Sequence, residues 1–115
     1  MHPRPPKKQR DIIALHKAPV EYKGLFVLIK RRKTSEKKLV IVISKKCGIA
    51  VRRNRIRRII REWFRIYWDK LPAHESWLIK VLPKSQELSA KKISISIREE
   101  LEEFYKQLSL PDSAN

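Results

Sequence analysis

Cationic side chains are the chemically active groups that this sequence concentrates most strongly. Seven arginines occur in the eighteen residues 48–65, GIAVRRNRIRRIIREWFR, with isoleucine, tryptophan and phenylalanine between them. A guanidinium group offers a planar fork of donors that matches a phosphate in bidentate geometry, which an ammonium group does not. This segment therefore favours phosphate binding.

Helical periodicity separates the two kinds of side chain in this segment. At about 100° per residue, arginines and Asn54 occupy one arc of a helix, and the opposite arc holds Ile56, Ile59, Ile60, Trp63, Phe64 and Tyr67. Only Arg52 and Arg53, in the first turn, fall on the apolar side. Glu62 is the only acid between Arg52 and Arg65, so the arginines lack the opposite charges of an ordinary exposed helix. The pattern predicts a helix that binds a polyanion with its polar face; a solvated charged face is the alternative.

The sequence SKKCG leads into this helix. It directly follows an apolar run, which places Ser44, Lys45 and Lys46 at the end of a predicted strand. Free backbone N–H groups and the helix dipole favour phosphate at the adjacent helix start. We interpret Gly48 as the turn residue and Cys47 as a small packed side chain.

Net charge is distributed unevenly along the 115 residues. Residues 1–70 contain 22 Lys and Arg against 5 Asp and Glu, whereas residues 71–115 contain 6 against 7. Such an imbalance opposes compaction unless a polyanion relieves it, and nucleic acid is the expected partner. No apolar run approaches the ~20 residues that cross a membrane, so a membrane partner is not expected. The single cysteine, Cys47, excludes an internal disulfide and is consistent with a cytoplasmic location.

Residues for protein-based catalysis or metal binding are not grouped in the sequence. The three histidines, His2, His16 and His74, have no nearby nucleophile or carboxylate pattern, and no zinc framework exists. The acidic cluster is predicted to be a solvated face of the last helix rather than a metal site; it comprises Glu99, Glu100, Glu102 and Glu103. We therefore predict no catalytic residue and no metal ligand in this chain.

Apolar patterns predict the remaining elements. Residues 11–18 form a short helix with Asp11 as N-cap, stopped by Pro19. Residues 24–32 and 38–44 are rich in β-branched side chains and predict a β-hairpin, and residues 76–82 predict a third strand. A last helix follows Ser89, its predicted N-cap, with apolar side chains at three- and four-residue intervals: Ile93, Ile97, Leu101, Phe104 and Leu108.

These elements predict one domain with two extensions. Residues 1–10 are Pro-rich and basic and predict a flexible arm, and residues 109–115 predict a disordered tail. Residues 11–108 predict a single RNA-binding α/β domain.

The segment SKKCGIAVRRNRIRRIIREWFR, residues 44–65, resembles the signature of the bacterial ribonuclease P protein component. In that family a strand ends in Ser-Lys-Lys, and Arg-Asn-Arg opens a long basic helix. The resemblance implies an α/β (α+β) two-layer sandwich of order αβββαβα. A mixed sheet of about four strands packs against helices, and the basic helix forms a left-handed crossover. The resemblance marks eight residues as the surface that meets RNA: Lys45, Lys46, Arg53, Asn54, Arg55, Arg57, Arg58 and Arg61. We add Ser44 and Arg65 to this predicted RNA-binding set.

The resemblance also implies a function and its partners. The active site belongs to a catalytic RNA and its bound magnesium, and the protein holds the 5′ leader of precursor tRNA in a cleft. The catalytic RNA and precursor tRNA are then the partners; no protein partner is implied, and the protein alone holds no magnesium. The chain departs from the family where two phenylalanines usually line the cleft, because Ile12 and His16 stand there. Ile12, His16, Phe26 and Lys30 are the candidate leader-binding residues, with a buried core position as the alternative for Phe26.

Two other classes of nucleic-acid-binding protein stay open at this point. A ribosomal or other structural RNA-binding protein would share the small basic α/β composition. A DNA-binding protein would use residues 53–65 as a recognition helix, but no helix-turn-helix partner directly precedes them.

Overall fold

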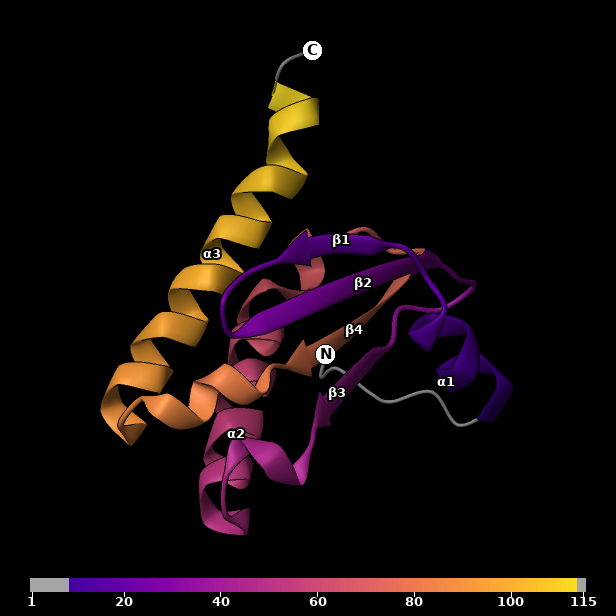
Figure 1. The fold of residues 1–115 in the computed structure, drawn as a ribbon. Helices are drawn as coiled ribbons and strands as arrows, with labels where there is room; N and C mark the ends of the chain where they lie inside the picture. The colour runs from indigo at the N-terminus through magenta and orange to yellow at the C-terminus, as the bar shows by residue number, and fades with distance from the viewer. Residues whose placement is uncertain (1–8, 114–115) are drawn as a thin grey trace.

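The computed structural model describes residues 9–113 as a four-stranded sheet with three α-helices (Figure 1). Three short 3₁₀ helices, η1 (Lys45–Cys47), η2 (Trp68–Lys70) and η3 (Pro83–Glu87), join the main elements. The order αβββαβα is confirmed by the main elements, which are α1 (Gln9–His16), β1 (Val20–Lys23), β2 (Val27–Lys33), β3 (Leu39–Ile43), α2 (Ala50–Tyr67), β4 (Glu75–Val81) and α3 (Ala90–Ser113).

Strand pairing differs from the sequence prediction. The strand order is β1-β2-β4-β3, with β2 antiparallel to both β1 and β4, and β3 parallel to β4. The predicted hairpin of residues 24–32 and 38–44 is therefore wrong, because β4 lies between those two strands. The short β1 has no strand pattern in its sequence, since VEYK carries no apolar run and is mostly exposed.

The connection between β2 and β3 explains why they do not pair. It passes over the first residues of β4, where the buried Ser76 hydroxyl lies 2.7 Å from the Thr34 hydroxyl and accepts from the Lys38 N–H at 3.1 Å. β4 is buried at five of its seven positions and occupies the centre of the sheet, where both faces are covered best.

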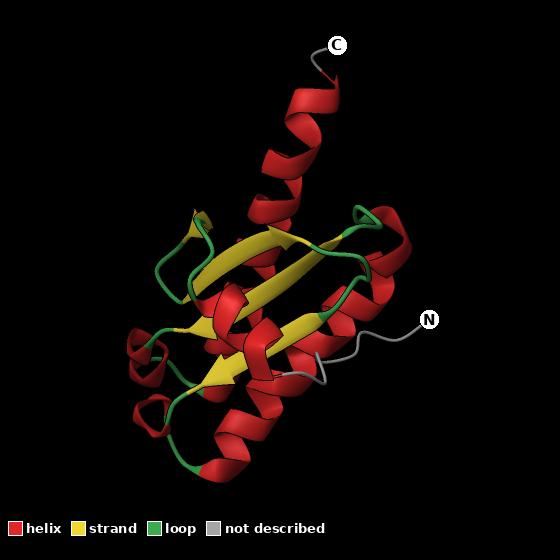
Figure 2. Cartoon of the chain, turned by 90° about the vertical axis from the view of Figure 1, so that its right-hand side faces the viewer, coloured by secondary structure: helices red, strands yellow, loops and turns green. Residues whose placement is uncertain are grey.

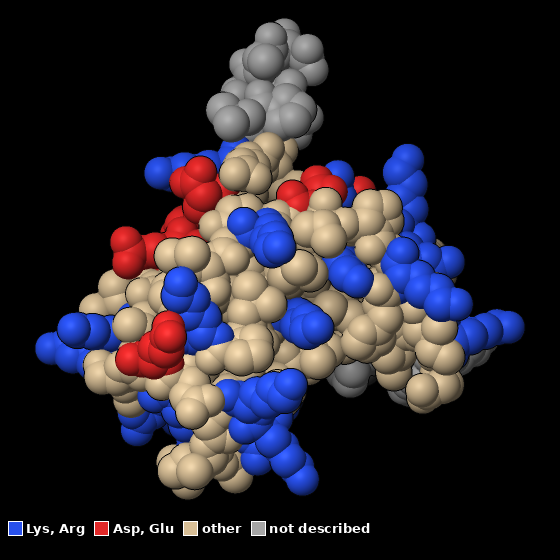
Figure 3. All heavy atoms as spheres, viewed as in Figure 1, with Lys and Arg blue, Asp and Glu red and all other residues tan. Residues whose placement is uncertain are grey.

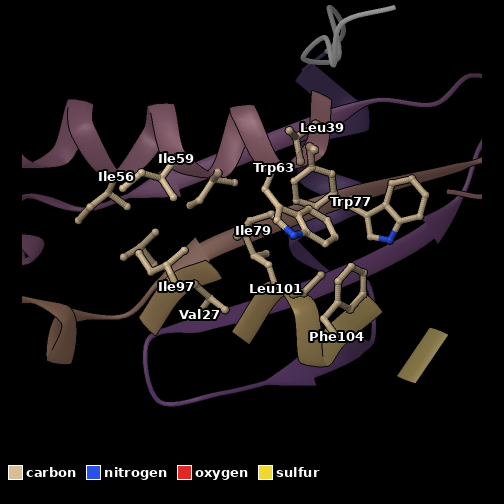
Figure 4. Packing of buried hydrophobic residues seen from close by; sticks show 14 of the residues in the cluster. Val27, Leu39, Ile56, Ile59, Trp63, Trp77, Ile79, Ile97, Leu101 and Phe104 are labelled. Atoms are coloured by element: carbon tan, nitrogen blue, oxygen red, sulfur yellow. The ribbon is translucent and has the colours of Figure 1, made fainter. Parts of the chain in front are cut away.

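The two faces of the sheet are covered unequally. α2 and α3 lie on one face, and α1 crosses the other (Figure 2). The main core lies between the sheet and the layer formed by α2 and α3, and side chains from the sheet and both helices point toward one another there (Figure 4). The opposite face has a smaller buried contact, in which Leu15 of α1 and Leu78 of β4 are each 1% exposed. This arrangement confirms the two-layer sandwich. The handedness of the β3-α2-β4 crossover stays a prediction.

The ends of α1 and α3 lie within a few residues of the positions that the sequence predicts. α1 begins at Gln9, so Asp11 lies in its first turn, where a carboxylate faces the positive end of the dipole, and is not the N-cap. The Ser89 hydroxyl accepts from the Lys92 N–H at 3.2 Å, which confirms the predicted cap of α3. α3 continues past Leu108 to Ser113. Residues 1–8 of the predicted arm lie outside the described residues.

Candidate nucleic-acid interface

The polar face of α2 is the most concentrated cationic surface on the described chain. Its apolar face is buried as predicted, with Ile56, Ile60 and Phe64 fully enclosed. On the opposite side Asn54, Arg55, Arg58, Arg61 and Arg65 are exposed, whereas Arg53 and Arg57 are half-buried. Burial of the apolar face against the sheet therefore fixes the helix and presents its arginines outward.

The arginines of this face differ in how far they are engaged. Arg57 donates to the side-chain oxygen of Asn54 at 3.3 Å. Arg65 donates to both carboxylate oxygens of Glu62, at 2.5 and 3.3 Å, and this hydrogen bonding raises the pKa of Arg65. Among the side chains of residues 9–108, Arg55, Arg58 and Arg61 form no ion pair with a carboxylate. These three guanidinium groups are the most available for phosphate.

Arg52 belongs to the protein interior rather than to this surface. Its Nη2 donates to the carbonyl oxygens of Ser85 and Leu88, each at 2.5 Å, and so joins the start of α2 to η3 and to the residue before the α3 cap. The helical wheel placed Arg52 on the apolar side, and the structure supplies the reason. Arg53 follows it half-buried, with its Nε enclosed.

Ser44, Lys45 and Lys46 lie together between the end of β3 and the start of α2. All three are exposed, whereas Cys47 is buried and its thiol donates to the Val81 carbonyl at 3.4 Å. Gly48 has a φ of 124°, and a Cβ there would lie 2.6 Å from Cδ of Arg52. Glycine is required for this turn, which brings the two lysines beside the first turn of the arginine helix.

The start of α2 carries no side-chain cap. Ile49 occupies the N-cap position in extended backbone, and no side chain there hydrogen-bonds to the first turn. The first N–H groups of a helix have no intrahelical partner, so they add to the cationic surface as anion donors.

Strand register places a second set of side chains on the sheet face that α1 only partly covers. Lys80 of β4 lies between Leu28 of β2 and Val42 of β3, and Lys80 is exposed. In the next row Leu78 lies between Lys30 and Val40. Figure 3 shows Lys and Arg side chains scattered over one side of the molecule, with Asp and Glu gathered mostly near α3. Sequence reasoning missed Lys80, although a single lysine inside the apolar run SWLIKVL was the available signal.

Three of the four candidate leader-binding residues lie near this sheet face. Ile12 is half-buried on α1 one turn before Leu15, and His16 is exposed at the end of the same helix. The Lys30 ammonium donates to the carbonyl oxygen of His16, so α1 and β2 meet at this point. Phe26 is 9% exposed and belongs to the core on the other face, which makes it unavailable for stacking on a base.

The acidic residues of α3 do not form one solvated face, contrary to the prediction. The Glu100 carboxylate accepts from the N–H groups of Leu25, Phe26 and Val27 at 3.0–3.2 Å. Glu102 accepts from Trp63 at 3.0 Å and from Tyr67 at 2.7 Å. Glu99 and Glu103 are exposed. No three His, Cys, Asp or Glu side chains within the described part of the chain are grouped as a metal site requires.

Comparison with known proteins points to one family. The family model described as Ribonuclease P matches residues 7–108. A ribonuclease P protein component from Desulfosudis oleivorans is 42% identical over 62 residues, covering 54% of this chain and 50% of that protein. Another from Dictyoglomus turgidum is 33% identical over 79 residues, covering 67% and 66%. The chain spans about half the length of several curated relatives that it matches.

Solved structures show the same fold. The RNase P protein from Thermotoga maritima superposes with a TM-score of 0.72 at 23% identity, covering 90% of this chain and 96% of that one. The RNase P protein of Staphylococcus aureus gives a TM-score of 0.70 at 23% identity, covering 84% and 91%. No helix in the described part of the chain is long and apolar enough to cross a membrane. The match over residues 7–108, together with the Ser-Lys-Lys turn and the arginine face of α2, shows that the chain belongs to the ribonuclease P protein family.

Proposed function

We propose that this chain is the protein subunit of ribonuclease P and assists removal of the 5′ leader from precursor tRNA. The observation that carries the proposal is the set of exposed guanidinium groups of Arg55, Arg58 and Arg61 on α2, which have no carboxylate partner among the described side chains, in a member of this family. Such an array suits the phosphates of a large RNA, and family membership supports a place in an RNA-cleaving ribonucleoprotein. The partners are the catalytic RNA and precursor tRNA.

Docking to the catalytic RNA is assigned to the surface formed by the polar face of α2 and the turn before it. Arg55, Arg58 and Arg61 provide guanidinium groups without competing carboxylates, and Lys45 and Lys46 extend the charge to the helix start. Uncapped N–H groups at that start favour a phosphate between them. Arg65 is expected to contribute less because Glu62 already binds it.

The leader of precursor tRNA is assigned to the open face of the sheet. Lys80 and the half-buried Leu28 and Val42 lie side by side there, and α1 borders the same face. A lysine beside apolar side chains suits a single strand, whose phosphates and bases are both accessible. Because the two binding surfaces use different elements, each is expected to be altered without loss of the other.

Magnesium is assigned to the RNA and not to this chain. Two acidic residues of α3 do not fit a magnesium site, because Glu100 binds three backbone N–H groups and Glu102 binds two aromatic side chains. Magnesium prefers octahedral coordination by several oxygens and waters, which these carboxylates cannot provide while engaged. We accordingly place both the metal and the catalytic groups in the RNA partner. The assembled particle is proposed to act in the cytoplasm.

Reconstitution with the catalytic RNA tests the proposal. The protein is mixed with that RNA at low magnesium, and cleavage of precursor tRNA is measured with and without protein. We expect cleavage only with protein, and a loss when Arg55, Arg58 and Arg61 are replaced by alanine. Arg98→Ala is the matched control, since Arg98 is an exposed arginine on α3. Tight RNA binding without stimulation of cleavage would instead indicate a structural RNA-binding protein.

A further inference from the structure

The start of α2 exposes two apolar side chains beside the cationic surface. Ile49 and Val51 are 74% and 69% exposed, the highest values among the large hydrophobic residues that the structure describes. Both are β-branched, and neither contributes to the core cluster. Exposed apolar side chains are common singly, but a pair within three residues and among cations marks an interaction surface.

The N-cap position of α2 also lacks the side-chain hydrogen bond that usually stabilises the start of a helix. N-cap positions favour Ser, Thr, Asp or Asn because their side chains bind the free N–H groups of the first turn. Here Ile49 holds that position without a cap, and the turn is maintained by Gly48 at a φ of 124°. An apolar residue therefore replaces a capping residue where the chain would gain stability from one.

The two side chains lie within the proposed RNA-docking surface. Residues three and four positions apart are neighbours on a helix, so Val51 adjoins Asn54 and Arg55. Ile49 follows η1 closely, with the exposed Lys46 three residues before it. The start of α2 can therefore contact an apolar group and a phosphate of the same ligand.

We propose that Ile49 and Val51 bind the base or ribose of an unpaired nucleotide in the RNA that docks on α2; this rests on the function proposed above. Phosphate contacts position an RNA but carry no information about its bases. A continuous duplex hides its base faces, whereas an unpaired nucleotide exposes one next to its own phosphates. The charged side chains that flank the pair in sequence, Lys46 and Arg55, are cationic and exposed, so the occupant must carry negative charge as well as an apolar face. The pair would let this surface distinguish a structured RNA with an unpaired site from a plain duplex.

Salt-dependent binding separates this apolar contact from the phosphate contacts. The variant Ile49→Ala with Val51→Ala removes apolar area without introducing a cap, and Ile95→Ala on α3 is the matched control, since Ile95 is 49% exposed. We expect the double variant to bind the catalytic RNA of ribonuclease P about tenfold more weakly at every salt concentration. Its log–log salt slope should be unchanged, because no phosphate contact is lost. Binding to a continuous RNA duplex should also be unchanged.

Other outcomes would overturn the inference, and they can be told apart. Equal weakening toward the catalytic RNA and the duplex, or a flatter salt slope, would mean that the pair acts through the arginine surface. Unchanged RNA binding, with loss of binding to phosphatidylglycerol vesicles, would indicate a membrane surface instead. A thermal melt of each variant checks the fold. If the wild-type protein itself shows no salt-dependent binding of the catalytic RNA, the proposed function fails first, and this inference with it.

Discussion

Arg52 and Arg55 lie three positions apart on α2, and the fold uses them differently. Arg52 donates to two carbonyl oxygens of the segment before α3, whereas Arg55 is exposed and unpaired among the described carboxylates. Position on the helix therefore engages one of two chemically identical side chains in contacts within the protein and leaves the other exposed, as the proposed binding role of Arg55 requires.

Replacing each arginine by alanine should separate these two roles. Arg52→Ala leaves two carbonyl groups without their donor and should lower the free energy of unfolding by about 1–3 kcal/mol. Arg55→Ala should leave unfolding unchanged and reduce the salt slope of RNA binding by roughly 0.7–0.9. Urea unfolding and RNA titration measure the two effects. Equal stability losses in both variants would contradict the division.

Glu100 has a structural role that its position in the sequence does not predict. Its carboxylate joins α3 to the turn between β1 and β2, and Gly24 in that turn leaves it room. A Cβ at Gly24 would lie only 2.0 Å from the nearer carboxylate oxygen. The side chain end is flexible, but three backbone donors hold it in place.

We expect both Gly24→Ala and Glu100→Gln to lower the free energy of unfolding by about 1–3 kcal/mol, because each disrupts charge-assisted hydrogen bonds. The matched control is Glu99→Gln with Glu103→Gln, whose side chains are exposed. The control should change neither unfolding nor magnesium-dependent cleavage by the reconstituted particle. Loss of cleavage in the control, with RNA binding intact, would point to a protein metal site.

At the level of elements, a carboxylate of α3 accepts hydrogen bonds from two aromatic side chains of α2 and so joins the two helices. Trp63 and Tyr67 stack with ring centroids 4.4 Å apart, and both donate to Glu102. The hydrogen bond to Glu102 raises the pKa of Tyr67, with smaller contributions from burial and charge. The contact holds the arginine helix against the rest of the core.

This contact predicts a loss of stability in alkali. Below the ordinary tyrosine pKa of 10.0 the phenol is protonated in both states, and its bond to Glu102 stabilises the fold fully. As pH rises further, the unfolded chain loses the proton first, so stability falls until the folded pKa is passed. Tyr67→Phe should therefore be less stable than wild type below pH 10 and approach it above, as measured by urea unfolding at each pH. A constant difference would contradict the assignment.

α1 and the open sheet face form the second proposed binding surface. Ile12 cannot stack on a base, and His16 is exposed with its carbonyl bound by Lys30. Base stacking on an aromatic side chain contributes about 1–3 kcal/mol. Ile12→Phe with His16→Phe should therefore raise the preference for precursor over mature tRNA by about tenfold or more. The ratio of the two dissociation constants, each with the catalytic RNA bound, is the measurement; an unchanged ratio would place the leader on other residues.

The whole molecule carries a net charge of +16, and this charge should govern its assembly. Each phosphate contact contributes roughly 0.7–0.9 to the log–log salt slope, so five contacts predict a loss of a hundredfold or more between about 50 and 200 mM salt. Titration of the catalytic RNA at several salt concentrations measures this slope. A flat titration would exclude the arginine face as the docking surface.

Local sequence determined the helices, three of the four strands and the two faces of α2. Helical and strand periodicities depend on neighbours within a few residues, so the buried arc around Ile60 and Phe64 was predictable. The cap at Ser89 and the turn at Gly48 are equally local. The Ser-Lys-Lys and Arg-Asn-Arg segments identified the family because they are contiguous in sequence.

Only the tertiary structure decided which elements meet. β2 and β3 are joined by a short polar loop and appeared to form a hairpin, but β4 pairs with both. Glu100 contacts backbone groups 73–75 residues away, and Arg52 reaches carbonyls 33 and 36 residues away. Sequence spacing carries no signal for such partners, because strand order and hydrogen bonding across the core depend on how the whole chain buries its apolar faces at once.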